Sequence, residues 1–260
     1  MHGAGLPWCC SLAVRFALLP RDTILPLPSI GDTFDPRNNA LNLLRLVFAL
    51  LVIFSHSIVL GGYPRSEALW GHASLGEIAV DAFFAISGFL IAASASRNSV
   101  TRYLWQRFLR IFPAFWVCLL VTAAVAGPIG WAAERNNSLA GYLTASGGPV
   151  RYIVANSLLR VRQTAIGGAP DHIPYPHVWN GSLWTLWPEF LCYLMLAALA
   201  VTNLLGRRRI VLALWVLSWA AAVGLYITGI FDVASGGHVH SVTVRILVRF
   251  TPIFFAGVVL

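Results

Sequence analysis

The chain has 260 residues, of which 58% are hydrophobic and only 11% are charged, and its mean hydropathy is +0.73. A soluble domain carries about 25% charged and about 45–50% apolar residues. This composition excludes a soluble enzyme, a disordered chain and a nucleic-acid binder, although the formal net charge is +8. The basic residues are all arginines in short clusters, which is typical of membrane topology. The sequence predicts an all-α, polytopic transmembrane helical bundle.

The first 36 residues contain five prolines around a short apolar patch that Arg15 interrupts. The patch lacks the basic, apolar and small-residue succession of a signal peptide. We expect residues 1–36 to be a poorly ordered extension and residues 37–260 to be the membrane domain.

Mostly apolar runs of about 20 residues, the length of a membrane-crossing helix, predict six spans. They lie at about 41–60, 77–96, 111–130, 183–202, 210–228 and 244–260. The last run reaches Leu260 without a polar flank. We therefore expect the working protein to contain more helices, with this domain incomplete at its C-terminus.

Arginine clusters follow the second and the fourth predicted spans. They comprise Arg97, Arg102, Arg107 and Arg110, and then Arg207, Arg208 and Arg209. Both clusters lie on one side if six spans are crossed in order, and the positive-inside rule makes that side cytoplasmic. We expect a multi-pass protein of the inner (plasma) membrane with a cytoplasmic N-terminus. Residues near 150–160 belong to the long outer loop in this topology. Alternatively, they form a re-entrant segment or lie along the membrane interface.

Two polar residues of the first span lie eleven positions apart, Arg45 and His56. Eleven steps of about 100° end about 20° past three full turns, so both residues share one helix face, about 16 Å apart along the axis. Charges inside a span are rare and functional by default. The alternatives are that Arg45 snorkels to the interface and that His56 is a satisfied packing residue.

The second span carries Asp81 near its outer end and Ser87-Gly88 in the middle. Asp81 is a candidate partner for His56, where it would fix the tautomer and raise the basicity of the imidazole. Ser87 is either a substrate contact or, with Gly88, part of a small-residue surface on which another helix packs. That surface comprises Ala82, Ala85, Gly88, Ala92 and Ala93.

Arg107 and Arg110 lie three positions apart on one helix face. They either anchor the helix at the interface or form a guanidinium fork for phosphates that arrive from the cytoplasm. Glu189 lies close to Trp184 and Trp187, where burial would suit a proton-transfer group; the alternative is an interfacial acid near a helix N-terminus. The histidines and cysteines show no metal-ligand spacing, so no metal is expected.

Four segments carry a family resemblance in order: RNNALNLLRLVFALLVIFSHS, VDAFFAISGFLI, RFLRIFP and NGSLWTLWPEFLCYL. Together they resemble the acyltransferase 3 family of integral-membrane O-acyltransferases, over about residues 37–194. The first has the family's Arg, ten residues, His; the third has Arg-x-x-Arg before a proline. The fourth has the Trp-x-Leu-x-x-Glu stretch and then Tyr193. The family usually has about ten helices, so this chain matches its first part.

The resemblance implies transfer of an acyl group, usually acetyl, from cytoplasmic acyl-CoA to a hydroxyl of a carbohydrate or related cell-envelope molecule, such as a glycolipid. His56 would be the base or a transient acyl carrier, and Asp81 or Glu189 would orient it or move a proton. The donor phosphates would be held by Arg45, Arg107 and Arg110. The acceptor would contact Trp184 and Ser87. Acyl-CoA would be a substrate, with no tightly bound cofactor.

Two other interpretations remain open. A proton-coupled transporter or flippase could use the same intramembrane charges as a relay, but the inverted repeats typical of such proteins are not seen in the sequence. The other interpretation is an inactive, truncated relic that inserts into the membrane.

Overall fold

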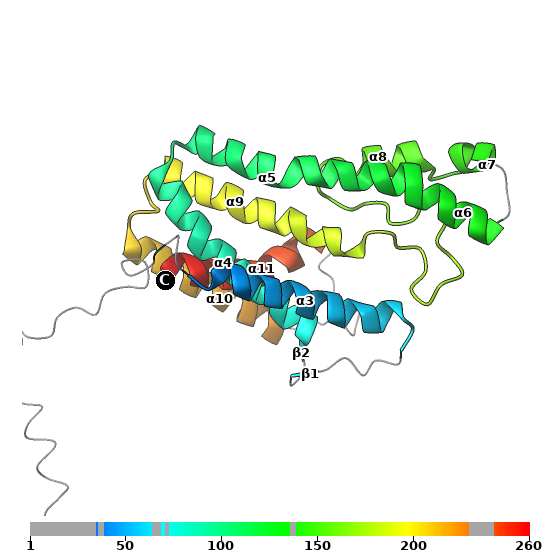
Figure 1. Ribbon diagram of the computed structural model, residues 1–260. Helices are drawn as coiled ribbons and strands as arrows, with labels where there is room; N and C mark the ends of the chain where they lie inside the picture. Colours follow the sequence, from blue (N-terminus) through cyan, green and yellow to red (C-terminus); the bar gives the residue numbers. More distant parts are fainter. Residues whose placement is uncertain (1–34, 36–38, 64–68, 71–72, 136–138, 229–241) are drawn as a thin grey trace, which may run out of the picture. The chain divides into compact units, whose positions relative to one another are not determined.

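The computed structural model describes residues 35, 39–63, 69–70, 73–135, 139–228 and 242–260 (Figure 1). The extension predicted over residues 1–36 lies outside these, apart from Asp35. From Ala40 on, the chain forms one compact unit. Among the residues that the structure describes, its helices are joined by loops and by one short antiparallel hairpin, β1 (Leu69–Trp70) and β2 (Ala73–Ser74).

The predicted spans correspond to six helical segments. They are α3 (Leu41–Leu60), α4 (Leu75–Arg97), α5 (Val100–Val121) with its continuation, α9 (Leu186–Val201) after the 3-10 helix η3 (Gly181–Thr185), α10 (Arg208–Ile227) and α11 (Val242–Val259). Five described helices are long and apolar enough to cross a membrane, and α11 has a shorter apolar stretch at Leu247–Val259. The predicted all-α membrane bundle is confirmed.

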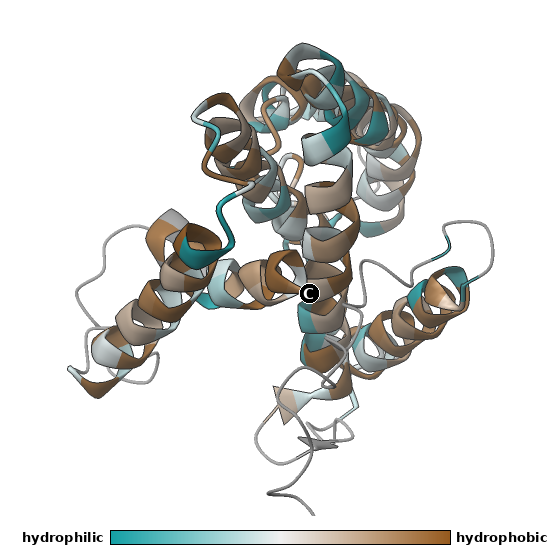
Figure 2. Ribbon diagram, turned by 90° about the vertical axis from the view of Figure 1, so that its left-hand side faces the viewer, coloured by the Kyte–Doolittle hydropathy of each residue, from teal (hydrophilic) through white to brown (hydrophobic). Residues whose placement is uncertain are grey.

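The apolar side chains of α3 and α10 face outward. Only 6% of the apolar window of each helix is buried inside the protein, and Leu43, Leu46 and Ile53 are among the exposed side chains of α3. Figure 2 shows hydrophobic residues along the outer faces of the helices. Such a surface is stable against lipid rather than water.

Glycines allow α4 and α11 to pack closely. A Cβ atom on Gly88 would lie 2.0 Å from the carbonyl oxygen of Phe254, and one on Gly257 would lie 1.9 Å from that of Ala85. The predicted small-residue surface is confirmed at Ala85 and Gly88, where backbones approach as they do in other membrane bundles. This contact fixes α11 beside α4.

The helix α5 continues through the π-helical segment η2 (Thr122–Ala126) into α6 (Gly127–Arg135). Pro128 has no N–H, so it cannot bond to the preceding turn, and the carbonyl of Ala123 instead accepts the Tyr142 hydroxyl at 2.6 Å. Gly127 has to be small here, since a Cβ atom would lie 2.3 Å from that hydroxyl. Through this hydrogen bond, Tyr142 attaches the short helix α7 (Leu139–Thr144) to the π-helical segment.

An outer cap, residues 139–180, covers the η2–α6 part of the long helix (Figure 1). It contains α7 and α8 (Pro149–Asn156). The buried Asn156 side chain accepts from Arg162 N at 2.7 Å and donates to Gln163 O at 2.7 Å. Asn180 Nδ2 donates to Thr122 Oγ1 at 2.7 Å and thereby ties the end of the cap to η2.

Candidate functional site

The contacts between α3 and α4 show which polar residues of the two helices lie at the same level along the bundle. The rings of Phe48 and Phe83 are 5.9 Å apart, and a Cβ atom on Gly76 would lie 2.7 Å from Ser55 Oγ. Extended along both helices, this antiparallel register places Arg45 beside the level of Ser87. It also places His56 about six residues, or about 9 Å along the axis, from the level of Asp81.

Two helices, α3 and α5, bring three arginines close together, and a third, α9, adds an acid and a tyrosine beside them. The guanidinium of Arg45 on α3 lies within electrostatic range of Arg107 and Arg110 on α5, and of Glu189 and Tyr193 on α9. Four of the predicted site residues therefore lie near one another, namely Arg45, Arg107, Arg110 and Glu189. Together with Tyr193 we call them the basic cluster.

Arg107 lies over aromatic rings. Its Cζ is 5.8 Å from the ring centroid of Tyr103 and 5.9 Å from that of Tyr193. Its Nε is buried without a hydrogen-bond partner among the described residues. A guanidinium held over ring faces keeps its donors directed elsewhere, so Arg107 is oriented and still has binding capacity.

Glu189 is held by its own helix. The Tyr193 hydroxyl, one turn further along α9, donates to Glu189 Oε1, and Tyr193 is completely buried. Tyr103 in turn donates its hydroxyl to the Tyr193 carbonyl at 3.1 Å. Against three guanidinium groups this cluster has one carboxylate, and no ion pair forms within it in the part of the chain that the structure describes.

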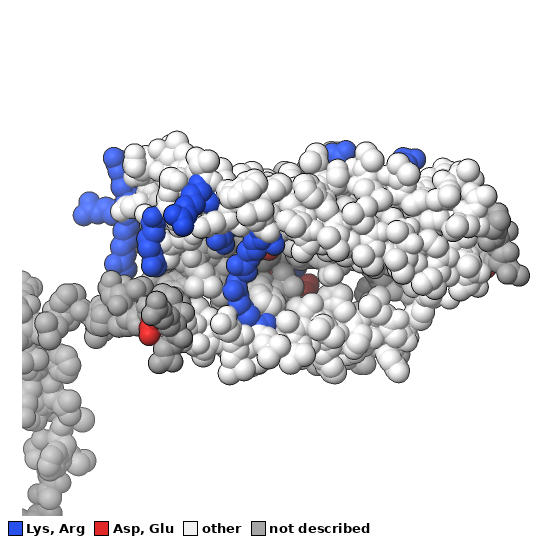
Figure 3. Space-filling view, turned by 45° about the horizontal axis from the view of Figure 1, so that its top comes forward, with Lys and Arg blue, Asp and Glu red and all other residues white. Residues whose placement is uncertain are grey.

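On the face drawn in Figure 3, basic atoms reach across a hollow between the helices, and acidic atoms lie inside it. An uncompensated positive charge within a membrane bundle is costly unless it faces water or an anion. The basic cluster is therefore suited to an anionic ligand.

A second charged group joins α4 to α11, and we call it the paired cluster. Arg249 contacts Glu77 Oε1 through Nη1 and Asp81 Oδ1 through Nη2, each at 3.4 Å. Glu77 also forms a capping box at the start of α4, with Ser74 N donating to Glu77 Oε2 at 3.0 Å. The Arg249 guanidinium lies 5.1 Å from the Phe250 ring centroid.

The structure pairs Asp81 with Arg249. It shows no hydrogen bond or ion pair between Asp81 and His56 within the described ranges. The His56 ring is exposed and its Nδ1 bonds to the Val52 carbonyl at 2.8 Å. Its neighbours Val52 and Val59 are half-buried, so His56 lies at the edge of the packed face of α3. Its Nε2 faces no described protein partner.

The two predicted substrate contacts, Trp184 and Ser87, differ in their exposure and in their neighbours. Trp184 packs against Phe250, with ring centroids 5.8 Å apart, and is 38% exposed. Ser87 is 5% exposed and precedes the glycine that contacts α11.

Arg249 and Tyr103 are polar site residues that sequence reasoning missed. Arg249 lies inside the last predicted span, so the rule that intramembrane charges are functional by default could have found it. Tyr103 carried no such signal, because a tyrosine near a helix start is common. No group of three histidines, cysteines or acids that could hold a metal occurs among the described residues.

Comparison with known proteins gives a consistent match. Residues 38–260 match the family described as an acyltransferase domain. The chain is 34% identical over 189 residues to an O-acetyl transferase of Shigella phage Sf6, a match that covers 72% of this chain and 53% of that protein. It is 32% identical over 155 residues to acyltransferase MdmB of Streptomyces mycarofaciens, covering 56% of this chain and 35% of that protein. The chain therefore spans about half, or less, of these relatives. No solved structure matches it.

Proposed function

The chain belongs to the acyltransferase 3 family of membrane proteins, and from this premise we propose that it is an O-acyltransferase. It transfers an acyl group from acyl-CoA to a hydroxyl of a carbohydrate or related cell-envelope molecule. The observation that carries the proposal is the basic cluster, in which three arginines from two helices converge with one carboxylate. Acetyl is the favoured acyl group because the relative from Shigella phage Sf6 is an O-acetyl transferase.

Arg45, Arg107 and Arg110 hold the donor phosphates. Guanidinium groups bind phosphate through paired, charge-assisted hydrogen bonds, and the orientation of Arg107 over two tyrosines leaves its donors available. The donor enters from the end of the bundle that carries Arg97, Arg102 and Arg207–Arg209. The positive-inside rule makes that end cytoplasmic, in a bacterial inner membrane, with the N-terminus on the same side.

His56 accepts the acceptor's proton. The hydroxyl oxygen attacks the thioester carbon, the carbon–sulfur bond breaks, and the proton passes to His56 and then to the departing thiolate. A two-step route through an acyl-imidazole on His56 would need the same ring. Its exposed position on α3 and the absence of a described partner at Nε2 support either role.

Glu189 orients His56 or moves a proton during the transfer. Its bond from Tyr193 holds the carboxyl within range of the arginines. Asp81 acts indirectly, through its pairing with Arg249. Trp184 and Ser87 contact the acceptor.

Loss of an acetyl increment from surface glycans tests the proposal. Mass spectrometry compares cells that express the chain with cells that express His56→Ala or His172→Ala, an exposed histidine of the outer cap. We expect acetylation with the native chain and His172→Ala and none with His56→Ala. Acetylation that persists in His56→Ala removes this histidine from the reaction, and no acetylation by any variant removes the acyltransferase proposal for this chain.

A further inference from the structure

The outer cap carries an apolar stripe on its exposed side. Leu143 of α7 is 60% exposed, and Val150, Val154 and Leu158 along α8 and its end are 70%, 68% and 73% exposed. Residues four positions apart lie on one face of a helix, so Val150 and Val154 form a row along α8, and Leu158 follows just after the helix ends. A row of this kind is unusual on a surface that faces water.

The stripe adjoins the membrane-facing surface of the long helix. Both α7 and α8 pack on the η2–α6 part of that helix, where Val125 and Ile129 are exposed and apolar as well. The stripe therefore lies at the edge of the hydrocarbon region. An amphipathic segment in this place rests in the interface with its apolar side toward the acyl chains.

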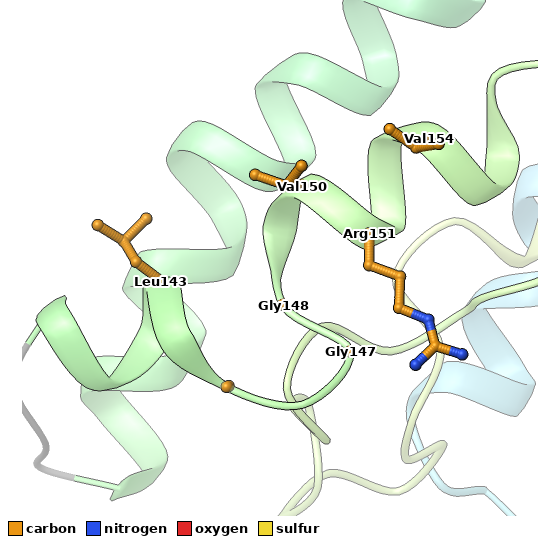
Figure 4. Close-up of a pocket in the computed structure, with 7 residues that line it drawn as sticks. Leu143, Gly147, Gly148, Val150, Arg151 and Val154 are labelled. Carbon is orange, nitrogen blue, oxygen red and sulfur yellow. The ribbon is translucent and has the colours of Figure 1, made fainter.

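Two open cavities lie beside the stripe and share Gly147 and Arg151. The first, of about 470 Å³, has Leu143, Val150 and Val154 in its wall. Figure 4 shows Val150 and Val154 on one side of α8 and the Arg151 side chain on the other. The second, of about 480 Å³, has mainly polar and glycine walls that include Ser146, Arg162, Gln163 and Gly168. Arg151 thus lines both cavities, with the apolar residues of α8 beside the first and Arg162 and Gln163 beside the second.

The arginines of these cavities have no acidic partner. In the part of the chain that the structure describes, neither Arg151 nor Arg162 forms an ion pair. The nearby acids have other partners, because Glu134 accepts from Asp171 N at 2.8 Å and Asp171 pairs with His177 at 3.4 Å. The site is therefore cationic and apolar at once.

We propose that this pair of cavities binds the phosphate headgroup of a membrane lipid. Arg151 and Arg162 contact the phosphate, and the acyl chains lie along Val150 and Val154. A soluble anion would match the arginines but leave the apolar row in water, whereas a phospholipid matches both. This inference does not depend on the proposed acyl transfer.

Photocrosslinking tests the placement of the stripe. A diazirine amino acid is introduced at Val154, or at Thr164 as an exposed loop control, in the chain reconstituted in phosphatidylglycerol and phosphatidylethanolamine. Mass spectrometry then counts lipid adducts. We expect adducts at position 154 and almost none at position 164; equal yields, or none at 154, overturn the placement.

A pair of variants tests the headgroup. Arg151→Gln with Arg162→Gln should lower the phosphatidylglycerol retained per purified chain about tenfold, because charge-assisted bonds to phosphate are lost. Arg160→Gln, which changes an exposed arginine that lines neither cavity, should change retention less than about twofold. Equal retention in the double variant and the control overturns the phosphate contact. The crosslinking result does not require these variants to fold.

A soluble oligouronate separates lipid from acidic carbohydrate. We expect the oligouronate to bind weakly and to leave the amount of retained phosphatidylglycerol unchanged. Binding that displaces the lipid and depends on Arg151 would assign the cavities to an acidic saccharide instead.

Discussion

The basic cluster and the paired cluster place similar residues in the same bundle with opposite charge balance. In the paired cluster, Arg249 has two carboxylate partners, Glu77 and Asp81. In the basic cluster, three guanidinium groups share one carboxylate, whose Oε1 already accepts the Tyr193 hydroxyl. The first arrangement is satisfied by the protein itself, and the second is not.

The difference separates structural from functional charge. An ion pair between neighbouring helices ties them together, and removing one partner leaves the other uncompensated. Unmatched arginines inside a bundle instead need water or an anion. Substitutions should therefore affect stability in the paired cluster and donor binding in the basic cluster.

The largest expected effect follows Arg107→Ala. It removes a guanidinium that we place on the donor phosphates, so the KM for acyl-CoA should rise about 10- to 100-fold, the equivalent of one charge-assisted contact. Arg102→Ala, at an exposed arginine of the same helix, is the matched control. An equal KM in the two variants would return Arg107 to an anchoring role.

Arg249→Met should lower the free energy of unfolding, because it leaves the carboxylates of Glu77 and Asp81 without the guanidinium that pairs with them. Because Arg249 is 41% exposed at its side chain, the cost should be about 1–2 kcal/mol, below that of a fully buried pair. Thermal unfolding in detergent measures it, and Asp81→Asn in the same chain should recover part of the loss. A stable Arg249→Met variant with a raised KM for the donor would reverse the roles of the two clusters.

Tyr193→Phe should have a smaller, mixed effect. It removes the hydroxyl that holds Glu189 and preserves the ring beside Arg107. We expect kcat to fall about tenfold, a typical contribution of one hydrogen bond to a charged group, with the donor KM nearly unchanged. Steady-state kinetics with varied acyl-CoA separate the two constants. Unchanged kcat would show that the position of Glu189 does not matter.

Tyr142→Phe provides a baseline outside both clusters. Loss of its hydrogen bond to the Ala123 carbonyl should lower the free energy of unfolding by about 1 kcal/mol, measured against Tyr175→Phe at an exposed tyrosine.

Burial raises the pKa of Tyr142 from 10 to about 12. The folded state therefore favours the neutral hydroxyl, and this stabilisation is complete below pH 10 and lost as the pH rises toward about 12. An alkaline transition of equal size in Tyr142→Phe would show that another group causes it.

The membrane bundle was predictable because each span is a long apolar run. The predicted ranges 41–60, 183–202 and 210–228 lie close to α3, the η3–α9 pair and α10. The third range, 111–130, was too short at its start, since α5 begins at Val100 and contains Arg107 in its first turns. Periodicity alone does not separate the polar beginning of a span from a loop.

The site was predictable where one helix or a motif defines it and not where two distant helices meet. Arg107 and Arg110 share a helix face, and Glu189 and Tyr193 are one turn apart, so their proximity follows from spacing. The partner of Asp81 depends on which helix packs beside α4, and the sequence does not specify that neighbour. The predicted pairing of Asp81 with His56 stays a mechanistic hypothesis, while the structure joins Asp81 to Arg249.

Donor binding to the chain in nanodiscs tests the central claim most directly. The dissociation constants of coenzyme A and of pantetheine, which has no phosphate, are measured for the native chain, Arg107→Ala and Arg249→Met. The account predicts that Arg107→Ala weakens coenzyme A at least about tenfold, that Arg249→Met changes it less than about twofold, and that neither changes pantetheine. Coenzyme A binding that is equal in the native chain and Arg107→Ala would contradict it.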